Sequence, residues 1–148
     1  MQTRYAWLAG VIDGEGSLSI WRRKTRSSGQ NGAEIICAQA GLSITNSSAA
    51  LLDECRALLD ALGVKYTYIT PGNSVHRPIR RIFVRNFASL LTLLDAVEPH
   101  MVGKRAQAAL LREFVTRAAA RKGFTGTEER IGYCAQMSKL NQTGDLIP

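Results

Sequence analysis

The feature that most constrains the fold is the order in which apolar periodicity changes, because a helical pattern followed by two strand patterns occurs twice. Helical spacing begins after Thr3 and stops at the glycines of DGEG, and two alternating stretches, residues 17–26 and 34–45, then flank the polar loop SSGQNG. NSSAALLDECRALLDALG predicts a second helix that ends at Gly63, and VKYTYIT and IRRIFVR predict a second hairpin. This order predicts an α+β fold with one four-stranded antiparallel sheet covered by helices on one face.

The C-terminal part of the chain is predicted to be helical. FASLLTLLDAVEPH is a short apolar helix, a longer helix runs from Lys104 to about Lys122, and GFTGTEER leads into a last helix from about Thr127 to Leu140. We expect all the helices to lie on the same face of the sheet.

Length and composition indicate a single domain, residues 1–148. Hydrophobic residues make up 45% of the chain and charged residues 21%, as in ordinary folded domains. No apolar run approaches the roughly 18 residues of a membrane span, and MQTRYAWLAG lacks the pattern of a secretory signal. Three widely spaced cysteines fit neither a disulfide framework nor a zinc site. We therefore expect an intracellular protein that does not bind a membrane.

The balance of charges is basic. The formal net charge is +7, from 19 Lys and Arg against 12 Asp and Glu. Basic residues concentrate in WRRKTR and HRPIRRIFVR, both of which overlap predicted strands. This pattern is typical of nucleic-acid binding, although a basic surface that binds no anion has the same composition.

The uncovered face of the sheet is predicted from the alternation of side chains along each strand. Because Leu18 and Ile20 belong to the core, their neighbours face outward, and the same rule applies to the other strands. Adjacent basic residues on the fourth strand require one of the two to face out. The predicted outward set is Ser19, Trp21, Arg23, Thr25, Gln39, Ser43, Tyr66, Tyr68, Thr70 and Arg80 or Arg81. Such donors and acceptors contact base edges and phosphates, so we expect a nucleic-acid-binding face.

Small residues recur along one side of the first predicted helix. Ala6, Gly10 and Gly14 are four residues apart, and Ala9 lies beside them, so another backbone can approach closely. A glycine inside a helix costs roughly 1 kcal/mol relative to alanine, which indicates a packing reason for Gly10. The stripe has two interpretations: contact with the same helix of a second copy, or small residues that occur by chance in a buried helix.

Glu15 lies at the C-terminal end of this helix, where a carboxylate is electrostatically unfavourable. Unpaired carbonyls there carry partial negative charge, and a carboxylate beside them costs a few tenths of a kcal/mol to about 1 kcal/mol. A lysine, a bound metal ion or water must compensate.

The segment LAGVIDGEG, residues 8–16, resembles the LAGLIDADG motif that names a family of homing endonucleases, and differs from it at three of nine positions. The predicted order of elements also resembles the αββαββα core of that family. The resemblance covers about residues 3–122 and leaves a C-terminal helical extension of about 123–148. Members with one motif act as homodimers. The resemblance implies an intron-encoded, site-specific endonuclease that makes a double-strand cut in a long, nearly palindromic DNA site.

The resemblance also assigns site residues. Glu15 takes the position of the catalytic, metal-binding acid, and the backbone carbonyl of Gly14 is a further ligand. Oxygen donors suit Mg²⁺, and Mn²⁺ or Ca²⁺ could occupy the same site. Lys104 takes the position of a catalytic lysine that stabilises phosphate charge or orders water, and Asn46 that of a polar residue that organises water or metal. Ala50 departs from the family, because some relatives carry a basic residue there.

The resemblance places four residues of the first helix, Ala6, Ala9, Gly10 and Asp13, in the interface between two copies. We also interpret Asp13 as a structural cap, which is a common role for an aspartate near a helix end.

Two other functions suit the same residues. An RNA maturase would use the basic face to bind the RNA of its host intron, and a DNA-binding regulator would bind a site without cutting it. Retention of both Glu15 and Lys104 favours the endonuclease over the regulator. His76 and His100 lack metal-ligand spacing and supply no competing site. The expected compartment is the cytoplasm of a bacterium or phage host, or an organelle.

Overall fold

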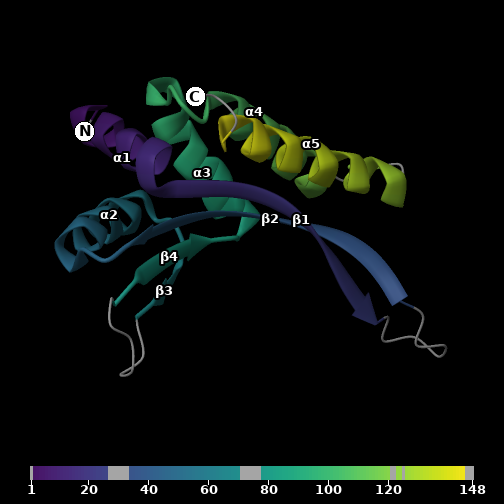
Figure 1. Cartoon of the computed structure of the whole chain (residues 1–148), viewed down its shortest axis with the longest axis horizontal. Coiled ribbons are helices and arrows are strands. Elements are labelled where there is room, and N and C mark those ends of the chain that lie inside the picture. The colour runs from purple at the N-terminus through teal and green to yellow at the C-terminus, as the bar shows by residue number, and fades with distance from the viewer. Residues whose placement is uncertain (1, 27–33, 71–77, 121–122, 125, 146–148) are drawn as a thin grey trace.

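The fold alternates helices and hairpins in the predicted order. The computed structural model describes residues 2–26, 34–70, 78–120, 123–124 and 126–145 (Figure 1). Its elements are α1 (Gln2–Glu15), β1 (Gly16–Arg26), β2 (Glu34–Asn46), α2 (Ala49–Leu62), β3 (Thr67–Ile69), β4 (Arg80–Val84), α3 (Phe87–Val97), the 3₁₀ helix η1 (Glu98–His100), α4 (Arg105–Ala119) and α5 (Thr127–Asp145).

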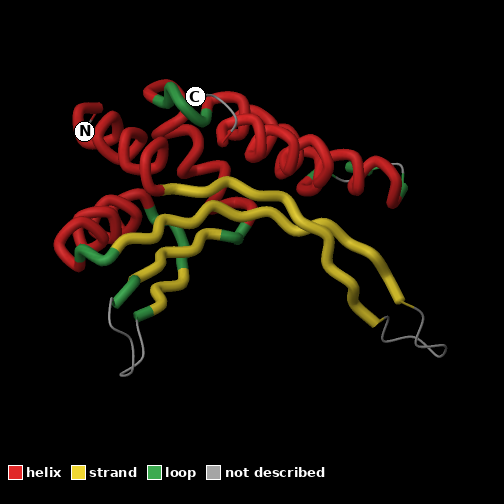
Figure 2. Tube along the Cα trace, in the orientation of Figure 1, coloured by secondary structure: helices red, strands yellow, loops and turns green. Residues whose placement is uncertain are grey.

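The strands form one four-stranded antiparallel sheet in the order β1-β2-β4-β3. Gly16 pairs with Ile44 at the start of the β1–β2 ladder, and Val84 of β4 pairs with Leu42. The helices lie on one side of the sheet, and the strands arch so that the other side is concave (Figures 1 and 2). The predicted fold class is therefore confirmed.

The hydrophobic core lies between the helices and the inner face of the sheet. Side chains of alternate strand positions have no exposed area: Leu18, Ala40, Leu42, Ile44, Ile82 and Val84. Leu8 and Ile12 of α1 are equally buried and pack in the same cluster. Burial of each large aliphatic side chain contributes about 1.5–3 kcal/mol. The face opposite these residues is left without a covering layer of helices.

Local capping explains where two of the helices begin and end. The hydroxyl of Ser48 accepts a hydrogen bond from the backbone N–H of Leu51 at 3.2 Å, which starts α2. The helix ends at Gly63, whose φ of +73° lies in the left-handed region that glycine adopts without strain. Asn86 caps α3 in the same way, because its side-chain oxygen accepts from the N–H of Ser89 at 3.0 Å.

The last helix, α5, packs on the same core as the elements before it. Tyr133, Cys134 and Met137 are buried, and the ring of Tyr133 lies edge-on to Phe114 of α4 with centroids 5.6 Å apart. The side-chain nitrogen of Asn141 donates to the carbonyl of Leu18 at 3.0 Å, which joins α5 to the edge strand β1. Within the described residues, no helix combines the length and apolar character needed to cross a bilayer.

Candidate functional site

The end of α1 is built so that Glu15 projects into solvent where helix becomes strand. α1 ends at Glu15 and β1 begins at the next residue, with no loop between them. A Cβ at Gly16 would lie 2.6 Å from the carbonyl oxygen of Ile12, so only glycine allows this direct exit. Gly14 and Glu15 are exposed. Within the described part of the chain, the Glu15 carboxylate has no ion pair or hydrogen bond.

Asp13 fastens this end of α1 to the segment that precedes α4. Its carboxylate oxygens accept hydrogen bonds from the backbone N–H groups of Val102 at 2.8 Å and Lys104 at 2.9 Å. Burial acts to raise the pKa of Asp13, but hydrogen bonds from Val102, Lys104 and Gly103 and the charge of Lys104 outweigh it, so the pKa is lowered. Asp13 therefore has a structural role, but its partners lie in the segment before α4 and not in its own helix.

Lys104 supplies a positive charge at the C-terminal end of α1. Its ammonium group donates to the backbone carbonyl oxygen of Asp13, one of the last carbonyls of the helix, where partial negative charge accumulates. Lys104 is the residue just before α4 and is half-buried. The structure thus brings Lys104 to the same helix end as Glu15, although the two are far apart in sequence.

Asn46 ends β2 and lies at the same end of the β1–β2 hairpin as Glu15. Ile44, two residues earlier, pairs with Gly16. The side-chain oxygen of Asn46 accepts from the backbone N–H of Ser48 at 2.8 Å, so part of this side chain serves to turn the chain into α2.

Much of the predicted outward set does face the concave side of the sheet. Ser19, Trp21, Arg23 and Gln39 alternate with buried residues, and Ser43 has 8% of its surface exposed. Arg81 is the outward member of its pair. Arg80 lies on the side of Ile82 and donates to the carbonyl of Ser47 at 3.2 Å. The side chain of Thr25 lies outside the described residues.

The predicted placement of Tyr66 and Tyr68 is wrong, because both turn toward the helices. Tyr68 pairs with the buried Ile82, and the guanidinium of Arg56 on α2 lies 4.2 Å from the centre of its ring. Tyr66 donates its hydroxyl to Asp60 of α2 at 2.9 Å. A shift of the alternation by one residue moves every side chain of a strand to the other face. Here the contacts with α2 decide which face the two tyrosines occupy. Thr70 is exposed beyond the end of β3.

Two aromatic side chains lie on the concave face: Trp21, which was predicted to face outward, and Phe83, which was not in the predicted set. The rings of Trp21 and Phe83 lie 6.0 Å apart, and they meet over Gly41. A Cβ at Gly41 would lie 2.7 Å from the ring of Phe83. The guanidinium of Arg81 lies 4.8 Å from the centre of the Phe83 ring. The sequence carried a signal for Phe83, since it alternates with Arg81 on the same strand.

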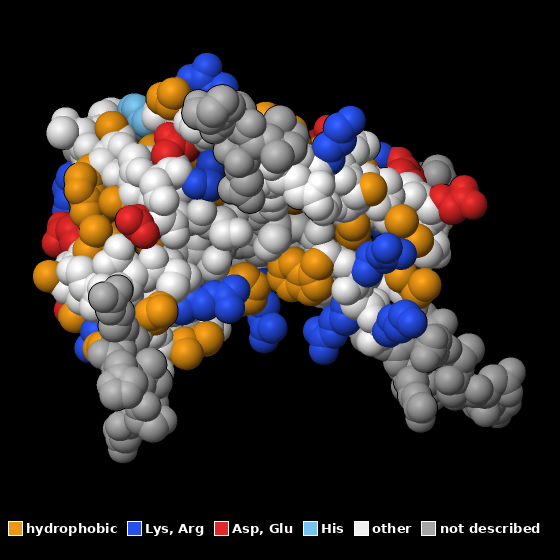
Figure 3. Space-filling model, viewed as in Figure 1, with side chains coloured by type: hydrophobic (Ala, Val, Ile, Leu, Met, Phe, Trp, Pro, Cys, Tyr) orange, Lys and Arg blue, Asp and Glu red, His pale blue; other side chains and the backbone are white. Residues whose placement is uncertain are grey.

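The charged strand side chains that the structure describes are all basic: Arg22, Arg23, Lys24, Arg80 and Arg81. Of these, Arg23 and Arg81 alternate onto the concave side of the sheet. Figure 3 shows Lys and Arg side chains projecting from the concave side, with Asp and Glu nearer the helices. A long anionic ligand is therefore attracted to this side.

One face of α1 is not covered by any residue that the structure describes. A Cβ at Gly10 or Gly14 would meet no described atom within 4 Å, and Ala6 is exposed. Trp7 is 41% exposed beside them. The assignment of Ala9 to an interface is wrong, because Ala9 is fully buried in the core of its own chain. Ala9 belongs instead to the stripe that contains Leu8 and Ile12.

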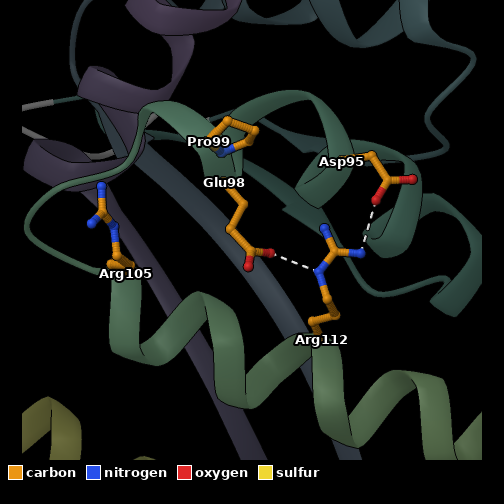
Figure 4. A pocket seen from close by; sticks show the side chains of 5 residues that line it. All are labelled: Asp95, Glu98, Pro99, Arg105 and Arg112. Atoms are coloured by element: carbon orange, nitrogen blue, oxygen red, sulfur yellow. Dashed lines mark hydrogen bonds and ion pairs between the residues drawn. The ribbon is translucent and has the colours of Figure 1, made fainter.

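A surface hollow lined by charged residues has a structural role. Arg112 of α4 pairs with Asp95 at 2.8 Å and with Glu98 at 2.7 Å (Figure 4). Arg105, at the other side of the hollow, donates its Nε to the carbonyl of Met101 at 3.1 Å. These contacts join α3 and η1 to α4, and the carboxylates of the hollow are already paired.

The chain has the fold of the LAGLIDADG homing endonucleases. I-CvuI, solved with the I-CreI DNA target in the presence of magnesium, is 20% identical, and the match covers 94% of this chain and 82% of I-CvuI with a TM-score of 0.70. The archaeal intron-encoded endonuclease I-Vdi141I, solved with DNA, is 19% identical over 93% of this chain and 84% of its own, with a TM-score of 0.71.

The LAGLIDADG meganuclease I-AabMI, bound to uncleaved DNA, is 20% identical with a TM-score of 0.62. This match covers 93% of our chain but 44% of I-AabMI. No family sequence model and no curated protein sequence matches the chain significantly.

Proposed function

We propose that this protein is a site-specific DNA endonuclease that cuts as a homodimer and requires a divalent cation. The observation that carries the proposal is the exposed carboxylate of Glu15 at the end of α1, which has no partner among the described residues and lies beside a helix face that the described residues leave uncovered. The shared fold with homing endonucleases that were solved on DNA supports the substrate. We treat residues 1–148 as a single domain, because α5 packs on the common core.

The groups around Glu15 suit a hard cation such as Mg²⁺. Glu15 offers carboxylate oxygens, and Gly14 offers a carbonyl in the last turn of the helix, where carbonyls lack helical partners. The described residues contain no group of three or more His, Cys, Asp or Glu placed to hold a metal ion. A second copy packed against the face of Ala6 and Gly10 would bring a second Glu15. I-CvuI complexes solved with magnesium and with calcium support this choice of ion.

Each remaining group has a separate task in phosphodiester hydrolysis. A bound divalent cation supplies a polarised water and neutralises charge at the phosphate. Lys104, held at the same helix end by its bond to the Asp13 carbonyl, adds positive charge near the reacting phosphate. Asn46 orders solvent at the end of β2. The concave face binds the duplex and fixes its position relative to Glu15, since β1 continues directly from α1.

The test is Glu15→Gln in a plasmid-library cleavage assay with Mg²⁺. The amide keeps the size of the side chain but removes the charge that holds the cation, so we expect cleavage to be abolished and DNA binding to persist. Glu128→Gln, an exposed change in the first turn of α5, is the matched control and should cut normally. Lys104→Met should slow cleavage without preventing cation binding.

Cleavage by Glu15→Gln at the wild-type rate would overturn the site. A wild-type protein that binds DNA tightly but never cuts with Mg²⁺ or Mn²⁺ would support the regulator, and selective binding to intron RNA would support the maturase.

A further inference from the structure

Large apolar side chains lie among the polar groups of the concave face, over which no described helix packs. Trp21 and Phe83, the aromatic pair, lie with ring centroids 6.0 Å apart. Ile69, whose partner in the ladder is Arg81, is 47% exposed, and Ile79, just before β4, is 55% exposed. Exposed apolar groups gathered on one surface and bordered by charges are typical of a binding surface.

The aromatic pair does not serve the hydrophobic core. The core lies on the opposite face of the same strands, where Ile20, Leu42 and Ile82 are buried. Gly41 provides the room for the two rings to meet over β2, because any side chain there would collide with Phe83. A side chain at position 41 of β2 would separate the two rings, and glycine leaves this space open.

Charge favours a nucleic acid as the ligand for this surface, and under the proposed function that nucleic acid is duplex DNA. Arg23 and Arg81 flank the aromatic pair, and no described strand side chain is acidic. In the major groove the only apolar group on a base edge is the 5-methyl group of thymine. The two ring centroids are 6.0 Å apart, less than twice the rise of about 3.4 Å per base pair. The aromatic pair therefore covers about two adjacent base pairs.

We propose that Trp21 and Phe83 recognise thymine methyl groups and so select A·T base pairs at one or two adjacent positions of the DNA site. The inference rests on the proposed function, because it assigns part of the sequence preference of the same DNA-binding face. Arg23 and Arg81 supply the flanking contacts to phosphate or base.

The test separates the methyl group from the rest of the base. Duplexes bound by the wild-type protein are selected from a random library in the presence of Ca²⁺, and each thymine of the selected site is then replaced by deoxyuridine in turn. Deoxyuridine lacks only the 5-methyl group. We expect a weaker affinity by about fourfold for each methyl removed beneath the rings, from the transfer free energy of one buried carbon, and no change elsewhere in the site.

Protein variants assign the effect to the rings. Trp21→Ser and Phe83→Ser should each lose the discrimination between thymine and deoxyuridine at the position beneath the ring that was removed, because serine has no methyl group to replace the contact. Tyr68→Ser makes the same kind of change on the helix side of the sheet and should keep the fourfold difference. Circular dichroism and thermal melting confirm that each variant is folded before it is compared.

The outcomes distinguish this inference from the proposed function. Selection of no sequence by the wild-type protein would overturn both. A selected site at which every deoxyuridine is tolerated, or variants that keep the discrimination of the wild type, would overturn the role of the rings alone.

Discussion

Replacing Asp13 with asparagine tests how the end of α1 is held against the start of α4. Asparagine keeps the shape but converts one acceptor oxygen into an NH₂ donor, so the N–H of either Val102 or Lys104 loses its acceptor. Hydrogen bonds to a charged group contribute about 1.5–3 kcal/mol when buried. Because Asp13 is only half-buried, we expect the free energy of unfolding to fall by about 1–2 kcal/mol after allowance for solvent screening.

The effect of this substitution should depend on pH. The pKa of Asp13 is lowered in the folded protein, so its carboxylate stabilises the fold at pH values above the ordinary pKa of an aspartate. That stabilisation is lost as the pH falls through the lowered value. The difference between wild type and Asp13→Asn should therefore be complete at pH 7 and shrink below about pH 4.

Urea denaturation, followed by circular dichroism at pH 7 and at lower pH, measures both effects. Asp53→Asn is the matched control, because the exposed Asp53 lies 3.5 Å from Arg56 in an i,i+3 pair, worth less than about 0.5 kcal/mol. An Asp13→Asn protein as stable as the wild type at pH 7, or a difference that stays constant down to pH 3.5, would refute the capping argument.

Two further substitutions test the exit from α1 into β1 and the open face of α1. Gly16→Ala should destabilise the fold by several kcal/mol or displace Glu15, because its Cβ would lie 2.6 Å from a backbone oxygen that cannot rotate away; near-normal melting together with normal cleavage would contradict this. Gly10→Leu should leave the melting of the isolated chain nearly unchanged, since a Cβ there meets nothing within 4 Å, but should abolish dimer formation in sedimentation experiments. Ala57→Leu, on the exposed side of α2, is the control, and a variant at Gly10 that remains dimeric would exclude this face as the interface.

Local signals in the sequence predicted the order of the elements and several of their boundaries. The end of α2 at Gly63 follows from a conformation that glycine favours, and the inner face of β2 follows from the alternation of Ala40, Leu42 and Ile44. In a long strand with regular alternation, the pattern itself shows which side chains face the core and which face outward.

The errors arose where the local pattern is short or where partners are distant in sequence. β3 is only three residues long, so its alternation does not fix which face Tyr68 occupies, and contact with Arg56 of α2 decides it. Ala9 is small enough to suit either the open side of α1 or the core. The partners of Asp13 lie 89 and 91 residues away, and no local pattern predicts them.

The direct passage from α1 to β1 fixes the number of residues between Glu15 and each side chain of β1. Glu15 is the last residue of the helix and Gly16 the first of the strand, so the acid and the side chains of β1 on the concave side lie on one continuous segment without a loop. Under the proposed function, substitutions at Ser19, Trp21 or Arg23 would change which bases are recognised without inserting or removing a residue between them and Glu15. The distance from the recognised bases to the cut phosphate would then stay the same while the target changes.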